Sequence, residues 1–224
     1  MTSLSLLQLV SPALPVGAFS YSEGLEVLIQ NRTIVDEAAL LSWLQTELQH
    51  GSLRVEAAAL RPLSALLCAW ATASDDSARE RLIDLDGWLH ASREAAEMRA
   101  QQRQMGVSLL QLLSDLGYPL PYQLSLSWPT AWAWACHALR VDDRAMVEGY
   151  LYSWIANQLS AAVRLLPLGP SRAQALQHKL LPLIEMQSDV LLRVVDPREL
   201  WSSGVGVGLA QLAHAELYSR LFRS

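Results

Sequence analysis

Apolar side chains recur at three- and four-residue spacing through most of this chain, and this period restricts it to a helical fold. Clear examples are Leu25, Leu28 and Ile29, and the series Leu40, Leu41, Leu44 and Leu48. The spacing gathers apolar groups on one face of an α-helix, whereas a half-buried strand would need strict alternation. Residues 117–129 do alternate, but a lone strand would have no partner elsewhere in the chain. We therefore predict an all-α, single-domain bundle of about eight to ten helices over residues 1–224, with 117–129 as a packed loop.

Paired carboxylates stand where predicted helices begin. Asp36, Asp75-Asp76 and Asp142-Asp143 each precede a helical run. A carboxylate there accepts the unpaired backbone N–H groups of the first turn and meets the positive end of the helix dipole. We interpret these residues as helix caps rather than as an acid–base pair.

The same reasoning sets expectations for the less regular segments. Ser74–Ser77 should form a break, and Ser171 should cap a late helix. Residues 78–116 should form one long helix or two nearly collinear ones, with weak points at Gly87 and Gly106. The glycine-rich residues 202–208 are predicted to be a flexible hinge before a last helix at 209–218.

Charge and composition exclude several classes of function. The formal net charge is −5, and Lys179 is the only lysine, so a nucleic-acid partner is not expected. No stretch approaches the ~20 apolar residues of a membrane span, and the N-terminus has no basic region typical of a signal peptide. Two distant cysteines, Cys68 and Cys136, are expected to be free thiols in a reducing compartment, Cys136 in the core. We predict a cytoplasmic protein.

Motifs of catalysis are missing from the sequence. There is no GxSxG elbow, HExxH pair or P-loop, and the GVGVG run has neither the spacing nor the preceding strand of a dinucleotide loop. The five histidines are scattered, and the adjacent Cys136 and His137 would point about 100° apart on a helix. We predict no catalytic residues, no metal ligands and no cofactor. A weak metal site shared between two copies of the chain stays open.

Two segments have an unusual composition: one loop is rich in apolar side chains, and one helical segment is polar on every face. The loop SPALPVGAFSYSEGLE, residues 11–26, must bury its apolar side chains, either in the core or against a partner. The segment Arg93–Gly106 is polar on every face, so it is either solvated or engaged with another polar surface.

The C-terminus, HAELYSRLFRS, interleaves aromatic and arginine residues. Tyr218, Leu221 and Phe222 alternate with Arg220 and Arg223, a composition typical of binding hot spots. The tail either docks on its own domain or becomes ordered on a partner. We predict that residues 202–224 are a mobile, partner-binding segment.

These segments carry a resemblance to a known family. The loop resembles the N-terminal signature of the urease accessory protein F (UreF) family, S-P/N-x-L-P-V-G-x-F/Y-S-x-S-x-G-L-E. Three later segments are similar to further motifs of that family. They are Arg93-Glu94 with Arg99, Gln102, Arg103 and Gly106, then Tyr152–Trp154 with Ala162–Gly169, and finally the ending Tyr218–Ser224. The motifs fall in order over essentially the whole chain.

The resemblance implies a non-enzymatic, dimeric accessory protein. Members of the family bind the accessory protein UreD, also called UreH, and with it recruit the GTPase UreG to apo-urease for nickel insertion. The partner-binding residues that it implies are Pro15, Gly17, Phe19, Ser20, Tyr21, Glu26, Arg93, Glu94, Arg99, Gln102, Gly106, Tyr218, Ser219, Arg220, Leu221, Phe222, Arg223 and Ser224. The alternatives are a small all-α ligand-binding protein or enzyme with a Trp- and Arg-lined pocket, or a protein that itself carries nickel.

Overall fold

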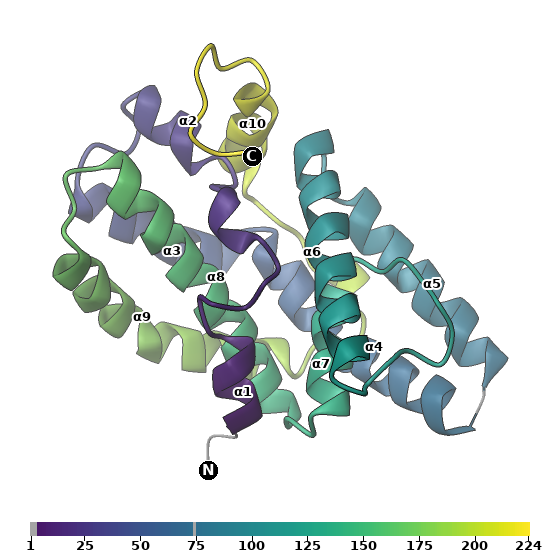
Figure 1. The fold of residues 1–224 in the computed structure, drawn as a ribbon. Helices are drawn as coiled ribbons and strands as arrows, with labels where there is room; N and C mark the ends of the chain where they lie inside the picture. The colour runs from purple at the N-terminus through teal and green to yellow at the C-terminus, as the bar shows by residue number, and fades with distance from the viewer. Residues whose placement is uncertain (1–3, 74) are drawn as a thin grey trace.

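The computed structural model describes residues 4–73 and 75–224, and these residues form helices and loops without a strand (Figure 1). The predicted all-α class is confirmed. The helices are α1 (Leu4–Leu9), η1 (Ala18–Ser20), α2 (Leu25–Gln30), α3 (Glu37–His50), α4 (Leu53–Ala73), α5 (Asp76–Ala91), α6 (Ala96–Asp115), α7 (Trp128–Ala138), α8 (Asp143–Leu165), α9 (Pro170–Leu191), η2 (Pro197–Glu199) and α10 (Val205–His214).

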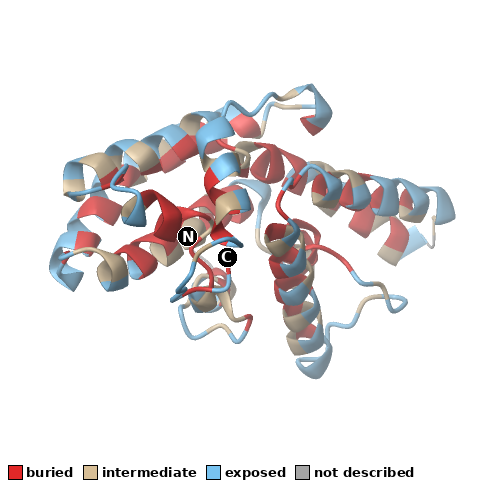
Figure 2. Cartoon of the chain, turned by 90° about the horizontal axis from the view of Figure 1, so that it is seen from above, coloured by how far each residue is buried: buried red, intermediate tan, exposed pale blue. Residues whose placement is uncertain are grey.

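The helix α4 lies at the centre of the bundle. It packs against α5 and α7 on one side and against α8 and α9 on the other, while α6 lies along α7. Its run Ala57–Ala59 is buried, as are Ala131, Ala133 and Ala135 of α7, and such small residues let helix axes approach closely. One continuous hydrophobic core therefore connects the two sides of the molecule, and Figure 2 shows buried residues on the inward faces of the helices.

The acidic helix caps form as predicted. Asp36 accepts a hydrogen bond from the Ala39 N–H at 2.9 Å, and Asp142 does the same for α8. Asp75 accepts from the N–H of Ser77 and of Ala78. A hydrogen bond with the Ser77 side chain is the main cause that lowers the pKa of the Asp75 carboxyl group, and the two N–H groups add to this effect. The paired carboxylates thus serve the helix ends. Ser74, part of the predicted break, lies outside the described residues.

Three predicted boundaries are wrong. Residues 78–116 do not form collinear helices, because α5 ends at Ala91 and α6 starts at Ala96 in a different direction (Figure 1). The break falls at residues 92–95, where Arg93 turns into the core, and Gly87 and Gly106 both lie inside helices. The late helix has Gly169 at its N-cap and Pro170 in its first turn, instead of a Ser171 cap.

The expected hinge at 202–208 is also wrong over most of its length. α10 begins at Val205 and includes Gly206 and Gly208. Glycine lowers intrinsic helix stability, but packing overrides that preference here. A Cβ on Gly24 would lie 3.2 Å from Gln211, which shows how closely α10 approaches the start of α2.

The segment between α6 and α7 is an irregular loop, as predicted. It has no strand among its described residues, and it buries Leu126 and Ser127 at its end. Tyr122, although exposed, stacks on Trp70 with ring centroids 6.3 Å apart. Cys136 is fully buried in α7, and both cysteines are free, as expected.

Candidate interaction site

The loop 11–26 crosses the molecule between α1 and α2. Val16 and Tyr21 anchor it in the core, whereas the side chain of Phe19 between them is 65% exposed. Gly17 turns the chain into η1 with φ = +76°, a left-handed conformation that favours glycine. The loop is therefore partly core-packed, as one interpretation of its sequence predicts, and it also presents an aromatic ring to solvent.

The C-terminal tail, residues 218–224, lies directly on this loop. The N–H and hydroxyl of Ser22 both donate to a main-chain oxygen of Ser224 at 2.7 Å. The N–H of Arg223 donates to the carbonyl of Ser20 at 2.8 Å. Two segments about 200 residues apart in sequence thus meet through backbone hydrogen bonds (Figure 1). We call residues 11–26 and 218–224 together the loop–tail surface.

Glu26 of α2 binds the backbone of the tail. Its side chain is buried, and it accepts hydrogen bonds from the backbone N–H of Leu221 at 2.7 Å and of Phe222 at 3.1 Å. Carboxylate acceptors make stronger hydrogen bonds than neutral ones, so Glu26 orders two consecutive residues of the tail.

The start of α6 completes the contact. Glu97 pairs with Arg220 at 2.7 Å, and the hydroxyl of Ser224 donates to Gln101 at 2.6 Å. All three segments singled out in the sequence therefore converge at one end of the molecule. The contacts come from Glu97 and Gln101, in the middle of the Arg93–Gly106 segment.

Each side of the tail has a different role. Phe222 and Ser224 are buried, whereas Tyr218, Ser219, Arg220, Leu221 and Arg223 are exposed. Leu221 keeps 58% of its surface in solvent, and Tyr218 is fully exposed. The inner side holds the tail to its own chain, and the outer side presents apolar and cationic groups to solvent. Phe19 and Pro15 of the loop are exposed as well.

A further apolar stripe follows the surface of α10, and sequence reasoning missed it. Val205, Leu209 and Leu212 lie at i, i+4 and i+7, and they are 70%, 61% and 45% exposed. Trp201, just before the helix, is 89% exposed. The signal was present as helical spacing, but the glycines among these residues pointed to a hinge instead.

Arg93 does not reach the surface. Its Nε lies 2.7 Å from Glu56, and its Nη1 donates to Ser52. Burial alone would lower the pKa of Arg93, but Glu56 and Glu23 outweigh burial and raise that pKa. Gln102 and Tyr150 donate to the same Glu56 carboxylate, the tyrosine at 2.8 Å.

Arg99 and Gly106 of this segment also make internal contacts. Arg99 donates to the carbonyls of Arg93 and Glu94, which stabilises the break between α5 and α6. Glu94 is exposed, with its carboxylate close to Gly208 of α10. Gly106 lets α6 touch the backbone of Leu126 and Ser127. Arg99 and Gly106 therefore support the site from inside, whereas Glu94 faces solvent.

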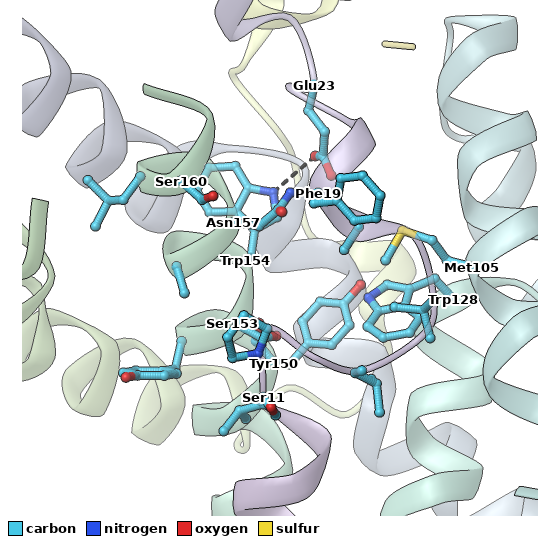
Figure 3. A pocket seen from close by; sticks show the side chains of 18 of the residues that line it. Ser11, Phe19, Glu23, Met105, Trp128, Tyr150, Ser153, Trp154, Asn157 and Ser160 are labelled. Carbon is cyan, nitrogen blue, oxygen red and sulfur yellow. Dashed lines mark hydrogen bonds between the residues drawn. The ribbon is translucent and has the colours of Figure 1, made fainter. Parts of the chain in front are cut away.

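A cavity of about 540 Å³ lies behind the loop, between α6 and α8 (Figure 3). Trp128, Tyr150 and Trp154 line it together with Met105. Its described lining residues include glutamate and arginine but no histidine, cysteine or aspartate.

Glu23 lies at the edge of this cavity and connects several elements. Its carboxylate accepts from Trp154 Nε1 at 3.0 Å, drawn in Figure 3, and from Gln101 Nε2 at 2.7 Å. Burial raises the pKa of Glu23, partly offset by Arg93. Its backbone has φ = +52°, which a non-glycine residue rarely adopts, and its N–H donates to a main-chain oxygen of Ser224. Sequence reasoning did not select this residue.

The described ranges, 4–73 and 75–224, lack two features. They hold no group of three or more His, Cys, Asp or Glu side chains that could bind a metal ion. None of their helices is long and apolar enough to cross a membrane.

Comparison with known proteins identifies the family. Residues 34–181 match the UreF family model. The chain belongs to the UreF family. It is 40% identical to the urease accessory protein UreF of Microcystis aeruginosa over 99% of this chain and 97% of that protein. The corresponding protein of Thermosynechococcus vestitus is also 40% identical, over 99% of this chain and 97% of that protein.

The UreF relatives also extend over the loop–tail surface. The UreF of Prochlorococcus marinus strain MIT 9312 is 35% identical, and the match covers 100% of both chains. The resemblance noted in the sequence is thereby confirmed. The UreF family model itself spans α3 to most of α9, so the loop and the tail lie outside the matched core.

Proposed function

We propose that this protein is a non-enzymatic urease accessory protein that acts as a scaffold. With a UreD/UreH-type partner it helps to recruit the GTPase UreG to apo-urease, so that nickel is inserted. Membership of the UreF family supports the general assignment. The observation that carries the scaffold role is the loop–tail surface, where three sequence segments converge and aromatic side chains remain exposed.

In the proposed mechanism the protein acts by binding its partner proteins. The outer side of the tail offers Tyr218 and Leu221, and the loop adds Phe19, all exposed. The stripe on α10 extends the apolar surface. Exposed apolar groups with aromatic and arginine anchors are typical of protein interfaces. We propose that the UreD/UreH-type protein buries this surface, and that the predicted mobility of residues 202–224 serves this step.

The buried residues support that surface instead of contacting the partner. Glu26 orders the tail, and Arg93, Gln102 and Gly106 hold α6 in the position from which Glu97 and Gln101 reach the tail. We propose further that the protein acts as a homodimer in the cytoplasm, and that it has neither a nucleic acid nor a membrane as partner.

Co-purification with the partner tests the scaffold role. The double variant Y218A/L221A removes two exposed side chains, so the fold should be retained while capture of a tagged UreD/UreH-type protein is lost. The variant V190A/M186A, on the exposed face of α9, is the matched control. A chain ending at His214 should also lose the partner. Unchanged capture by both altered chains would remove the tail from the mechanism.

The cavity behind the loop favours one alternative, a ligand-binding role for a Trp- and Arg-lined pocket. Co-expression of a urease operon with and without this gene separates the two functions. A scaffold predicts urease that lacks nickel when the gene is absent. Full nickel loading of urease without the gene, or turnover of a substrate by the purified chain, would contradict our proposal. Equilibrium dialysis with nickel tests whether the chain itself carries the metal.

A further inference from the structure

The cavity behind the loop has the size and the walls of a small-molecule site. Its volume of about 540 Å³ lies within the range of roughly 300–1,000 Å³ that is common for ligand pockets. The rings of Trp128 and Tyr150 line it and stack with their centroids 6.5 Å apart, and Trp154 lines it further along α8 (Figure 3). Such walls favour a flat aromatic molecule, which gains both apolar burial and ring stacking.

The buried arginine of the lining already has its counterion. Arg93 pairs with Glu56, its Nη2 2.5 Å from Glu56 Oε1, and it also donates to Ser52. Tyr150 donates to the other oxygen of the same carboxylate at 2.8 Å. A carboxylate or phosphate group that entered the cavity would therefore lose its solvation without meeting a free guanidinium.

The other charged residues that the structure describes in the lining also have partners. Glu23 accepts from Trp154 Nε1 at 3.0 Å and from Gln101 Nε2 at 2.7 Å. Arg164 donates to the carbonyl of Phe19 at 2.6 Å, and it is exposed, so solvent screens its charge. The interior of the cavity thus suits a neutral molecule.

Two buried amides of the lining each have one atom without a partner. Gln102 and Gln177 are only 4% and 5% exposed. Gln102 turns its NH₂ group to Glu56, which only accepts, and its Oε1 has no partner among the described residues. Gln177 Oε1 accepts from Gln174, and Gln177 Nε2 has no partner within the same ranges. An unpaired buried amide atom is costly, so these atoms favour a molecule that brings a donor or an acceptor.

We propose that this cavity binds a neutral, flat aromatic molecule whose polar groups pair with the free amide atoms of Gln102 and Gln177. Val16, Phe19 and Glu23 all line the cavity, so a bound molecule contacts the loop that also holds the C-terminal tail. Binding here requires no turnover. The site is independent of the scaffold role, because ligand binding by the isolated chain and capture of a partner protein are measured separately.

Titration with 2-quinolinone tests the site in the full-length protein. This probe is a neutral, flat, two-ring lactam with one N–H donor and one carbonyl acceptor. Saturation-transfer NMR should show saturable binding of the probe with a Kd of about 0.1–1 mM, as expected for so small a molecule. Absence of saturable binding to the wild-type chain in this range would overturn the proposal.

Hydrogen exchange with and without the probe locates the binding site. Protection should rise in residues 11–26 and in α8, which both line the cavity. The competing location is the apolar stripe of α10, where Val205 and Leu209 are exposed. Protection that rises only in α10 would show adsorption to that stripe and would overturn the proposal.

A tryptophan placed in the wall should block the cavity. Ala156 of α8 lines it and is only half-buried, so A156W should fold and should weaken binding of the probe at least about tenfold. A175W, at an exposed position of α9 outside the lining, should keep the wild-type Kd. Exchange in α4 reports whether each variant is folded. A folded A156W protein with the wild-type Kd would contradict the assignment.

A second pair of changes tests the amides. Q177L removes the unpartnered Nε2 and needs no new partner, so the free energy of unfolding should not decrease. N-methyl-2-quinolinone keeps the shape of the probe but offers no N–H to Gln102. Binding of this analogue by Q177L should be at least about tenfold weaker than binding of 2-quinolinone by the wild type. Equal affinity in these two measurements would show that the amides do not hold the ligand.

Discussion

The guanidinium of Arg164 lies over the ring of Phe222, with its central carbon 4.1 Å from the ring centroid. The same side chain donates to the carbonyl of Phe19 at 2.6 Å. Arg164 thus connects the end of α8 to both parts of the loop–tail surface. Partial burial lowers the pKa of its guanidinium, which nevertheless stays charged at neutral pH.

Replacing Arg164 should release the loop and the tail without unfolding the core. R164A loses a cation–π contact and a hydrogen bond, together about 1–2 kcal/mol. We expect protection of the Phe222 amide from hydrogen exchange to fall about tenfold, while α4 keeps its protection. R172A, which removes an exposed ion pair with Glu37, is the control. Equal protection of Phe222 in R164A and R172A would contradict this role.

Breaking the buried pair of Arg93 and Glu56 should cost much more than breaking an exposed pair. R93A leaves Glu56 charged in the core, so the free energy of unfolding should fall by about 3–5 kcal/mol. R144A, which removes exposed contacts with Glu148 and Asp189, should cost less than about 1 kcal/mol. Urea denaturation measures both. A similar decrease in the free energy of unfolding in R93A and R144A would contradict this difference between buried and exposed ion pairs.

Two glycines inside helices should respond in opposite ways to alanine. At Gly106 a Cβ would collide with the backbone of Leu126 and Ser127, so G106A should destabilise the protein by about 1–3 kcal/mol. At Gly87 a Cβ would meet no atom within 4 Å, so G87A should stabilise it by about 0.5–1 kcal/mol through helix propensity. Chemical denaturation of both variants shows whether each substitution raises or lowers the free energy of unfolding. A stabilising G106A would show that α6 can move away from α7.

Glu47 should make stability depend on pH. Burial is the main cause that raises the pKa of its carboxyl group from 4.5 to about 7, with Arg93 opposing the shift and Glu23 adding to it. The folded state therefore holds this proton between pH 4.5 and about 7, where the unfolded state has lost it. The contribution of Glu47 to stability then falls as pH rises through this window.

E47Q should remove this dependence. The variant should be more stable than the wild type at pH 7.5, by up to about 3 kcal/mol, and the difference should shrink toward pH 4.5. Urea denaturation at several pH values measures it. E185Q, at an exposed position on α9, is the control. An E47Q protein with the wild-type pH profile would show that Glu47 is not the group responsible.

Helix identity and the starts of α3, α5 and α8 were predictable because they depend on neighbours in sequence. The apolar spacing of α3 and α8, and the caps Asp36 and Asp142, involve residues within four positions of one another. The motifs of the loop and the tail also indicated the family. Predictions failed where packing opposed local preference, as in α10, whose glycines are helical because the helix lies against α2.

The role of each site residue depended on contacts between distant parts of the chain. Arg93 and Tyr218 are both polar or amphipathic residues in unusual segments, and only the fold shows that the first is buried against Glu56 while the second is exposed. Ser22 meets Ser224 across a separation of 202 residues. Periodicity and capping act over a helical turn, so they determine where helices form. Burial, ion pairing and the docking of the tail arise only when those helices pack, because their free energies belong to contacts that no local pattern contains.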